Sequence, residues 1–123
     1  MEQEIHTPFE LFGYDCGEGW WPLIKEAQQL IDKWNELNYD GDHGKVEFAQ
    51  VKEKWGELCL YLNWYPEELI DPIRKLEERS RHVCEHCGTT ENVTLENTHG
   101  WYMTLCHECR KKELEIYTNM FKH

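Results

Sequence analysis

The sequence predicts a mixed α+β fold: a helix, a β-hairpin and a second helix, followed by a small cysteine-containing module and a terminal helix. Three observations predict it. Apolar residues recur at alternating spacings of four and three between residues 22 and 37. Two segments rich in β-branched and aromatic residues flank a Trp-Gly pair at 55–56, and two C-x2-C pairs lie in the last third of the chain. These patterns are typical of an amphipathic helix, a hairpin and a metal-stabilised module, respectively.

Residues 1–19 are expected to be irregular, ending in the glycine-bracketed segment CGEG. A helix is expected over 22–37, with Pro22 in its first turn, where the missing N–H costs nothing. One face of this helix is predicted to pack on a core. Its apolar residues are Leu23, Ala27, Leu30, Trp34 and Leu37, widened by Ile24 and Ile31.

A turn-rich loop, NYDGDHGK, follows at 38–45. Val46–Lys54 and Glu57–Leu62 are then predicted to be the strands of a hairpin. Helix remains the alternative for 46–54, because KVEFAQVKEK also contains helix-forming residues.

A second helix is expected from about Pro66 to Arg81, with an apolar stripe. Asp71-Pro72 leaves its start open: either Asp71 caps the helix, or Pro72 lies early enough to be tolerated. Short strands at 93–96 and 101–105 and a helix over 107–121 complete the chain. We therefore expect an acidic α+β domain over 1–81 and a cysteine module with its helix over 82–123, packed as one unit. The apolar residues of the helix over 66–81 are Leu69, Ile70, Ile73 and Leu76, and those of the helix over 107–121 are Leu114, Ile116, Tyr117 and Phe121.

The four cysteines of this module are Cys84, Cys87, Cys106 and Cys109, in the spacing C-x2-C-x18-C-x2-C. Each pair places two thiolates on one tight turn, and two facing turns give the closed tetrahedral shell of a structural Zn²⁺. One structural zinc ion is therefore expected. Replacement of one cysteine by a neighbouring histidine is the alternative ligand set. The candidates are His82, His86, His99 and His107.

Two further cysteines, Cys16 and Cys59, are expected to be free thiols, with Cys59 buried in the run LCLYL. The opening segment MEQEIHTPFE does not fit a secretory signal, and no apolar run reaches 18 residues. A cytoplasmic protein without a membrane anchor is therefore expected. In that compartment two C-x2-C turns, here called knuckles, bind metal rather than form disulfides.

Charge is unevenly distributed along the chain. Of the net charge of −11, residues 1–72 carry 16 acidic and 5 basic side chains, whereas residues 73–123 carry 8 of each. An acidic front half repels nucleic-acid phosphates and attracts a basic protein surface. A solvated acidic face without a partner is the alternative.

Aromatic residues make up 13% of the chain, more than a small core easily holds. Exposed tryptophan and tyrosine side chains dominate the energetics of protein interfaces. We therefore expect some of them to contact a partner. The candidates are Trp20, Trp21, Trp64 and Tyr65.

The segments GEGWWPLI, AQVKEKWGELCLYL, CEHCG and GWYMTLCHEC follow one another within residues 13–109. This order resembles a family of small phage and prophage zinc-ribbon proteins with the pattern G-D-G-W, Q-V-K-E-K-F-G-x-L-R-x-Y, C-E-x-C-G and G-W-x-x-T-L-C-x-x-C. Here Glu18, Trp55 and Cys59 stand at the Asp, Phe and Arg positions. The resemblance implies a phage origin and no particular reaction.

Three other functions are alternatives to protein binding. Basic residues around the cysteine module and the aromatic pair Trp101 and Tyr102 favour nucleic-acid binding. Glu96, Asn97 and His99 lie between the cysteine pairs as in HNH nucleases, but no Asn follows His99 before Cys106. An enzyme with an unrecognised site is a third class. The basic residues are Arg79, Arg81, Arg110, Lys111 and Lys112.

The loop after the first helix resembles a calcium-binding loop, with Asn38, Asp40 and Asp42 at the first ligand positions. The match requires His43 to be an insertion and leaves Gln50 where a bidentate Glu is needed. We expect no tight calcium site.

Together these observations favour a phage-encoded, non-enzymatic zinc-binding protein that acts in the host cytoplasm by binding a host protein with a basic surface. A defence or transcription component is one candidate target and its inhibition one candidate effect; the sequence determines neither the partner nor the direction of the effect. A nucleic-acid-binding zinc-ribbon regulator is the second interpretation.

Overall fold

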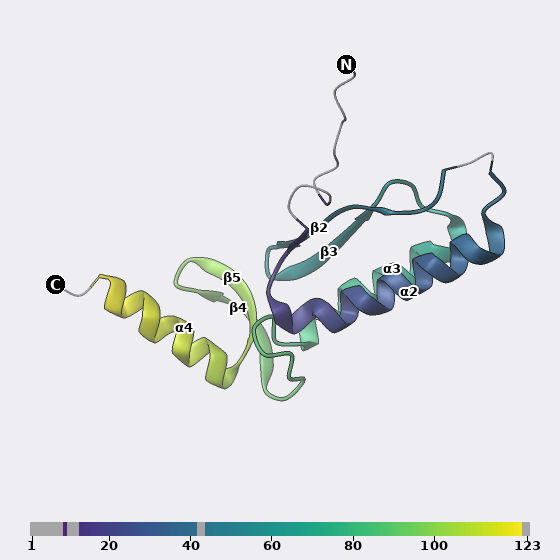
Figure 1. The fold of residues 1–123 in the computed structure, drawn as a ribbon. Helices are drawn as coiled ribbons and strands as arrows, with labels where there is room; N and C mark the ends of the chain where they lie inside the picture. The colour runs from purple at the N-terminus through teal and green to yellow at the C-terminus, as the bar shows by residue number, and fades with distance from the viewer. Residues whose placement is uncertain (1–8, 10–12, 42–43, 122–123) are drawn as a thin grey trace, which may run out of the picture.

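The computed structural model describes residue 9 and residues 13–41 and 44–121. It confirms a mixed α+β fold with three helices and two small sheets in the described part of the chain (Figure 1). In chain order the elements are β1 (Tyr14–Asp15), a 3-10 helix (Glu18–Trp20), α2 (Trp21–Asn38), β2 (Phe48–Lys54), β3 (Glu57–Leu62), α3 (Glu67–Arg79), a second 3-10 helix (Ser80–His82), β4 (Val93–Thr98), β5 (Trp101–Cys106) and α4 (His107–Met120).

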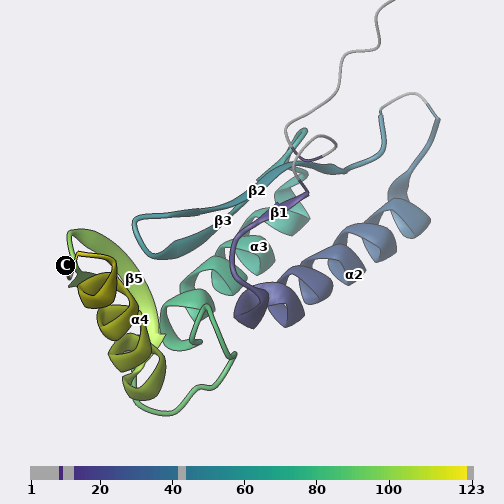
Figure 2. The same ribbon diagram turned by 60° about the vertical axis from the view of Figure 1, so that its left-hand side comes forward.

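The first sheet has the strand order β1-β2-β3, with β1 parallel and β3 antiparallel to β2. Helices α2 and α3 lie side by side on one face of this sheet (Figure 2). The core between these two layers is apolar. Its buried members are Trp20, Leu23, Ile24, Ala27, Ile31, Val46, Phe48, Val51, Leu58, Leu60, Leu62, Leu69, Ile73 and Leu76.

Helix α2 extends the predicted helix by one residue at each end. Pro22 occupies its first turn, as expected from the residue's fixed φ and missing donor. Leu23, Ile24, Ala27 and Ile31 are buried, so the helix turns the predicted apolar stripe to the sheet. Leu37, at the end of that stripe, is instead 71% exposed.

The hairpin prediction is confirmed, and strand rather than helix forms over 48–54. Alternation buries Leu58, Leu60 and Leu62 on the helix-facing side of β3. The turn has positive φ at both central residues, 56° at Trp55 and 79° at Gly56. Two such residues are the requirement of a tight hairpin turn whose twist matches its strands.

Strand β1 corrects the expectation that residues 1–19 are irregular. Tyr14 and Asp15 pair in parallel with Val51 and Lys52 and so add a third strand to the sheet. In α3, Pro72 lies inside the helix rather than at its start, so the second of the two predicted arrangements is observed. Asp71 is a residue of the helix and not its cap.

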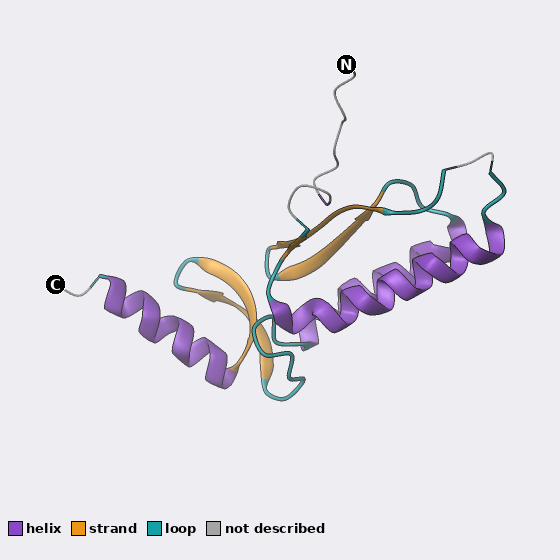
Figure 3. Ribbon diagram, viewed as in Figure 1, coloured by secondary structure: helices purple, strands orange, loops and turns teal. Residues whose placement is uncertain are grey.

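Strands β4 and β5 form a separate antiparallel hairpin, and α4 follows at once. The hairpin lies between the α2–α3 layer and α4 (Figure 3). A contact crosses the expected boundary at residues 81 and 82: the Trp20 indole N–H donates to Val83 O at 2.8 Å, and it also donates to Ser80 O at 3.1 Å on its own side of the boundary. None of the helices in the described ranges is long and apolar enough to span a membrane.

Candidate metal centre

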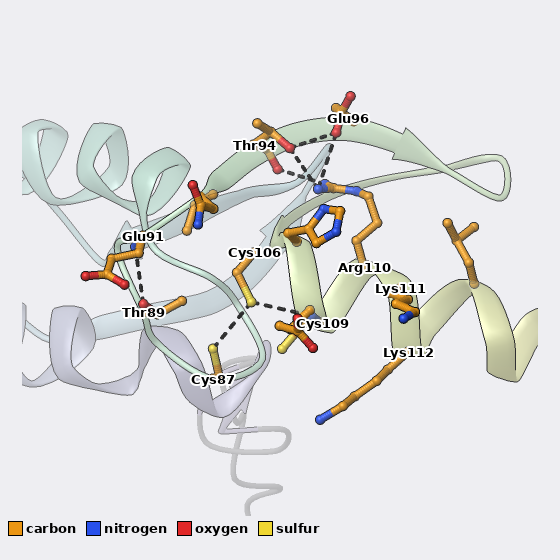
Figure 4. A pocket seen from close by; sticks show the side chains of 15 residues that line it. Cys87, Thr89, Glu91, Thr94, Glu96, Cys106, Cys109, Arg110, Lys111 and Lys112 are labelled. Carbon is orange, nitrogen blue, oxygen red and sulfur yellow. Dashed lines mark hydrogen bonds and ion pairs between the residues drawn. The ribbon is translucent and has the colours of Figure 1, made fainter.

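The four cysteines of the two C-x2-C pairs converge on one point. Cys84 and Cys87 come from the turn after α3, Cys106 ends β5, and Cys109 lies in the first turn of α4. Their four sulfur atoms all lie within 4.8 Å of one another. Cys87 Sγ is 3.8 Å from Cys106 Sγ, and Figure 4 shows these two residues together with Cys109. A tetrahedral ion with metal–sulfur bonds of about 2.3 Å requires sulfur–sulfur edges of about 3.8 Å. The four cysteines are positioned to hold one metal ion.

Backbone N–H groups support the sulfurs in the same way in both pairs. Cys87 N donates to Cys84 Sγ at 3.5 Å, and Cys109 N donates to Cys106 Sγ at 3.4 Å. In the second pair this bond is also the N-terminal cap of α4, with Cys106 as the capping residue. The local fold that starts the helix therefore also orients two of the four sulfurs.

The electrostatics of the cluster favour a cation. Burial opposes ionisation of Cys84, but N–H groups of Cys87, Cys106 and His86 lower the pKa of its thiol to about 7. Burial and the neighbouring sulfurs raise the pKa of Cys109. Four adjacent thiols therefore cannot all ionise without a positive charge among them, which is what a bound metal ion provides.

Glu85 is a buried carboxyl inside the first pair. Its backbone N–H donates to Thr104 O, and its side chain accepts from Thr104 N at 3.1 Å. Burial raises the pKa of this carboxyl to about 7, although the bond from Thr104 N opposes the shift. Glu85 thus fastens the first knuckle to β5. Its only sign in the sequence is an acidic residue between two cysteines.

The CGEG segment reaches the metal centre from the other end of the chain. Gly19 N donates to Glu85 O at 3.0 Å. A Cβ on Gly19 would lie 2.0 Å from Cys84 O, and a Cβ on Gly17 would lie 2.1 Å from Glu85 O. The two glycines are therefore required by close backbone packing against the first knuckle, not by a turn conformation.

Arg110, next to Cys109 of the cluster, is bound through its side chain to the β4–β5 hairpin. Its guanidinium donates to Thr94 and lies 3.3 Å from Glu96 (Figure 4). It also donates to Thr98 Oγ1 and to the carbonyls of Leu105 and Met103. The side chain is 14% exposed. The nucleic-acid-binding alternative placed this residue on the binding surface. In the structure its N–H groups instead donate hydrogen bonds within the protein.

A depression of about 1000 Å³ lies beside the second pair, and Figure 4 shows the side chains that line it. Its three acidic side chains, Glu91, Glu96 and Glu108, match its three basic ones. One of the basic side chains, Arg110, is already hydrogen-bonded within the protein. This surface therefore lacks the excess positive charge that phosphate binding requires. The basic side chains are Arg110, Lys111 and Lys112.

The predicted partner-contact residues do not form one surface. Trp20 is completely buried, so its prediction as a contact residue is wrong; its ring fills the core beneath α2. Trp21 and Tyr65 are 44% and 43% exposed, but Trp64 is half-buried and its ring packs edge-on against Trp34. Trp34 lies 13 residues along α2 from Trp21, about 20 Å at 1.5 Å per residue. These side chains therefore belong to opposite ends of the helix layer.

The other two candidate sites have different outcomes. His99 stacks on Tyr117 with ring centroids 4.5 Å apart and lies 3.1 Å from Glu113, so it links the β4–β5 turn to α4. Asp42 and His43 of the calcium-like loop lie outside the described residues. Among the described residues, the cysteine cluster is the group with the geometry of a metal site.

Comparisons with protein-family models, with curated proteins and with solved structures find no match to this chain. The four-cysteine cluster, together with the groups that support it, is therefore the direct basis for a function.

Proposed function

We propose that the four cysteines bind one Zn²⁺ and that β4, β5 and the two knuckles form a zinc ribbon. Soft thiolate donors in a four-sulfur tetrahedral set suit zinc. The metal would be structural, because four protein thiolates fill its coordination shell and leave no position for substrate or water. It would join three segments that meet at the cluster: the end of α3, the end of β5 and the start of α4.

We further propose that the protein is a non-enzymatic binding protein whose partner is a protein with a basic surface. The observation that carries this proposal is the segregation of all the net negative charge into residues 1–72. Exposed acids of this half include Glu36 on α2, Glu47 in the loop before β2 and Glu67 at the start of α3. The resemblance to small phage proteins makes a host protein the partner class, and the host cytoplasm the place of action.

Exposed aromatic side chains add to this proposal. Trp55, Trp101 and Tyr102 are 70%, 64% and 47% exposed. Charge complementarity chiefly raises the association rate, whereas buried aromatic contacts slow dissociation. A partner recognised by both features would associate faster at low salt and would dissociate faster when an aromatic contact is removed.

The test is a pull-down of the tagged, metal-loaded protein from nuclease-treated host lysate, followed by binding kinetics with the captured protein. Replacement of Glu36, Glu47 and Glu67 by Gln should lower the association rate and its salt dependence. The matched control removes three exposed acids from the other half: Glu91, Glu108 and Glu115. The proposal fails if both triple variants behave alike. It also fails if nuclease treatment removes all captured material while the protein binds DNA or RNA at physiological salt.

A further inference from the structure

A cleft of about 340 Å³ opens between the tips of the two hairpins. It is lined by Glu53, Lys54, Trp55, Gly100, Trp101 and Tyr102. We propose that this cleft binds the guanidinium group of an arginine side chain on a basic protein segment. The inference rests on the proposed protein-binding function and names the surface and the chemical group that it recognises.

Trp55 is the residue that singles out this cleft. It has φ 56°, in the left-handed region that bulky side chains rarely adopt, and it is 70% exposed. The first position of such a turn favours Asn, Asp or Gly. A tryptophan there is unfavourable in conformation and gains little from burial in the free protein. Such strain at an exposed side chain is typical of a functional position.

The cleft is held in shape by contacts between the two hairpins. Thr104 Oγ1 donates to Gly56 O, which fixes the turn of the first hairpin on β5 of the second. A Cβ on Gly56 would lie 2.2 Å from Leu95 Cδ1, so the turn also packs closely against β4. The Trp55 and Tyr102 rings lie 6.2 Å apart at 66°. The two rings therefore form two walls at a steep angle before any ligand arrives.

The chemistry of these walls favours a cation. Indole and phenol faces attract cationic groups, with tryptophan the strongest, and the planar guanidinium stacks on aromatic faces better than an ammonium does. The lining includes one acidic side chain, Glu53, which accepts a hydrogen bond from Gly56 N at 2.6 Å, and one basic side chain, Lys54. The lining of the cleft is therefore neutral overall. The chain as a whole carries −11, which raises the local concentration of cationic ligands and disfavours nucleic-acid bases with their phosphates.

The experiment uses the full-length, metal-loaded protein and two acetylated tripeptides, Gly-Arg-Gly and its uncharged isostere Gly-citrulline-Gly. NMR titration should shift the indole N–H signals of Trp55 and Trp101 with the arginine peptide and leave them in place with the citrulline peptide. Trp55→Asn should weaken arginine-peptide binding by about fivefold or more. The same variant should keep or raise the melting temperature, because Asn suits the turn.

Trp21→Ala is the matched control, since Trp21 is 44% exposed but lies outside the cleft. It should leave arginine-peptide binding unchanged. Equal shifts with both peptides, unchanged binding by Trp55→Asn, or a stronger response to a hexaproline peptide would overturn the assignment. If the front-half acid variants weaken binding of the captured protein while Trp55→Asn does not, the proposed function stands and the cleft assignment falls. If no protein partner is captured and the arginine peptide does not shift the indole signals, both fall.

Discussion

The guanidinium of Arg110 holds Thr94 from two sides: Nη1 donates to Thr94 Oγ1 at 2.8 Å and Nη2 donates to Thr94 O at 2.7 Å. The same group reaches the carbonyls of Met103 and Leu105 on the neighbouring strand. One side chain in the first turns of α4 thus clamps both strands of the second hairpin. Helix α4 has no buried residues of its own, so its position depends on this clamp, on the cysteine cluster and on the contacts of His99 with Glu113 and Tyr117.

Replacing Arg110 by Lys should loosen α4. A single ammonium cannot reproduce the fork of donors that Arg110 extends to two strands, and part-buried carbonyls would lose their partner. We expect a loss of about 1–3 kcal/mol in stability of this module and faster hydrogen exchange along α4. The exposed neighbour Lys112, changed to Ala, should alter stability by less than about 0.5 kcal/mol. Equal exchange in both variants would show that the clamp does not position the helix.

Gly19→Ala should destabilise the protein, because its Cβ would lie 2.0 Å from Cys84 O. Relief of the clash requires the CGEG segment to move away from the first knuckle, at a cost of about 1–3 kcal/mol. Gly44→Ala is the control, since nothing lies within 4 Å of its Cβ position and its φ is ordinary. Chemical denaturation compares the two. A Gly19→Ala protein as stable as Gly44→Ala would mean that the close approach is not needed.

Arg110 and Gly19 also show which features of the fold could not be predicted from the sequence. Periodicity predicted α2 and the first hairpin, because a helix or strand that buries one face shows that face in its own residues. The cysteine spacing predicted the metal cluster for the same reason, because each C-x2-C pair that supplies two sulfurs is a local pattern in the sequence. Arg110 and Gly19 act on segments distant in the chain, on Thr94 and Cys84, and neither contact leaves a local pattern.

Other differences have related causes. Strand β1 has two residues, too few for an alternating pattern, and it forms only because β2 offers a free edge. Trp20 and Trp21 are adjacent and chemically identical, yet one is buried and the other 44% exposed. The 3-10 helix over 18–20 decides which of them faces the core. The aromatic content of the sequence alone cannot show which of the two tryptophans is buried.

The carboxyl of Glu77 provides a test by pH. Burial raises its pKa, even though Leu60 N donates to it at 2.8 Å. A raised folded-state pKa means that folding favours the protonated form, so this group lowers stability as pH rises through the interval between its unfolded and folded pKa values. Glu77→Gln keeps an acceptor for Leu60 N and removes the buried charge. The stability of the variant relative to the wild type should rise as pH increases above about 4.3, the pKa of a free Glu.

Urea denaturation at several pH values measures this difference. Glu78→Gln is the matched control, because Glu78 is the exposed neighbour on the same helix. A Glu77→Gln gain that is constant with pH, or that is equalled by Glu78→Gln, would contradict the burial argument.

The two cysteines outside the cluster should be unreactive in the folded protein. Burial raises the pKa of Cys16 to about 12, with Asp15 and other acids adding to the shift, and burial also raises the pKa of Cys59. Since the thiolate is the reactive form, a disulfide reagent at pH 8 should label neither quickly. Addition of a chelator should release the four cluster cysteines to rapid labelling. Mass spectrometry of the labelled peptides locates the reaction, and fast labelling of Cys16 before chelation would contradict this account.

The most direct test of the central claim is the metal content of the purified protein, measured by elemental analysis and native mass spectrometry. We predict one zinc ion per chain. Cys84→Ser should lose the metal and unfold at least the module over 82–123, because thiolate binding energy is folding energy in such sites. Cys59→Ser, which removes a thiol outside the cluster, should retain the zinc ion. A wild-type protein that is fully folded and free of metal would contradict the account.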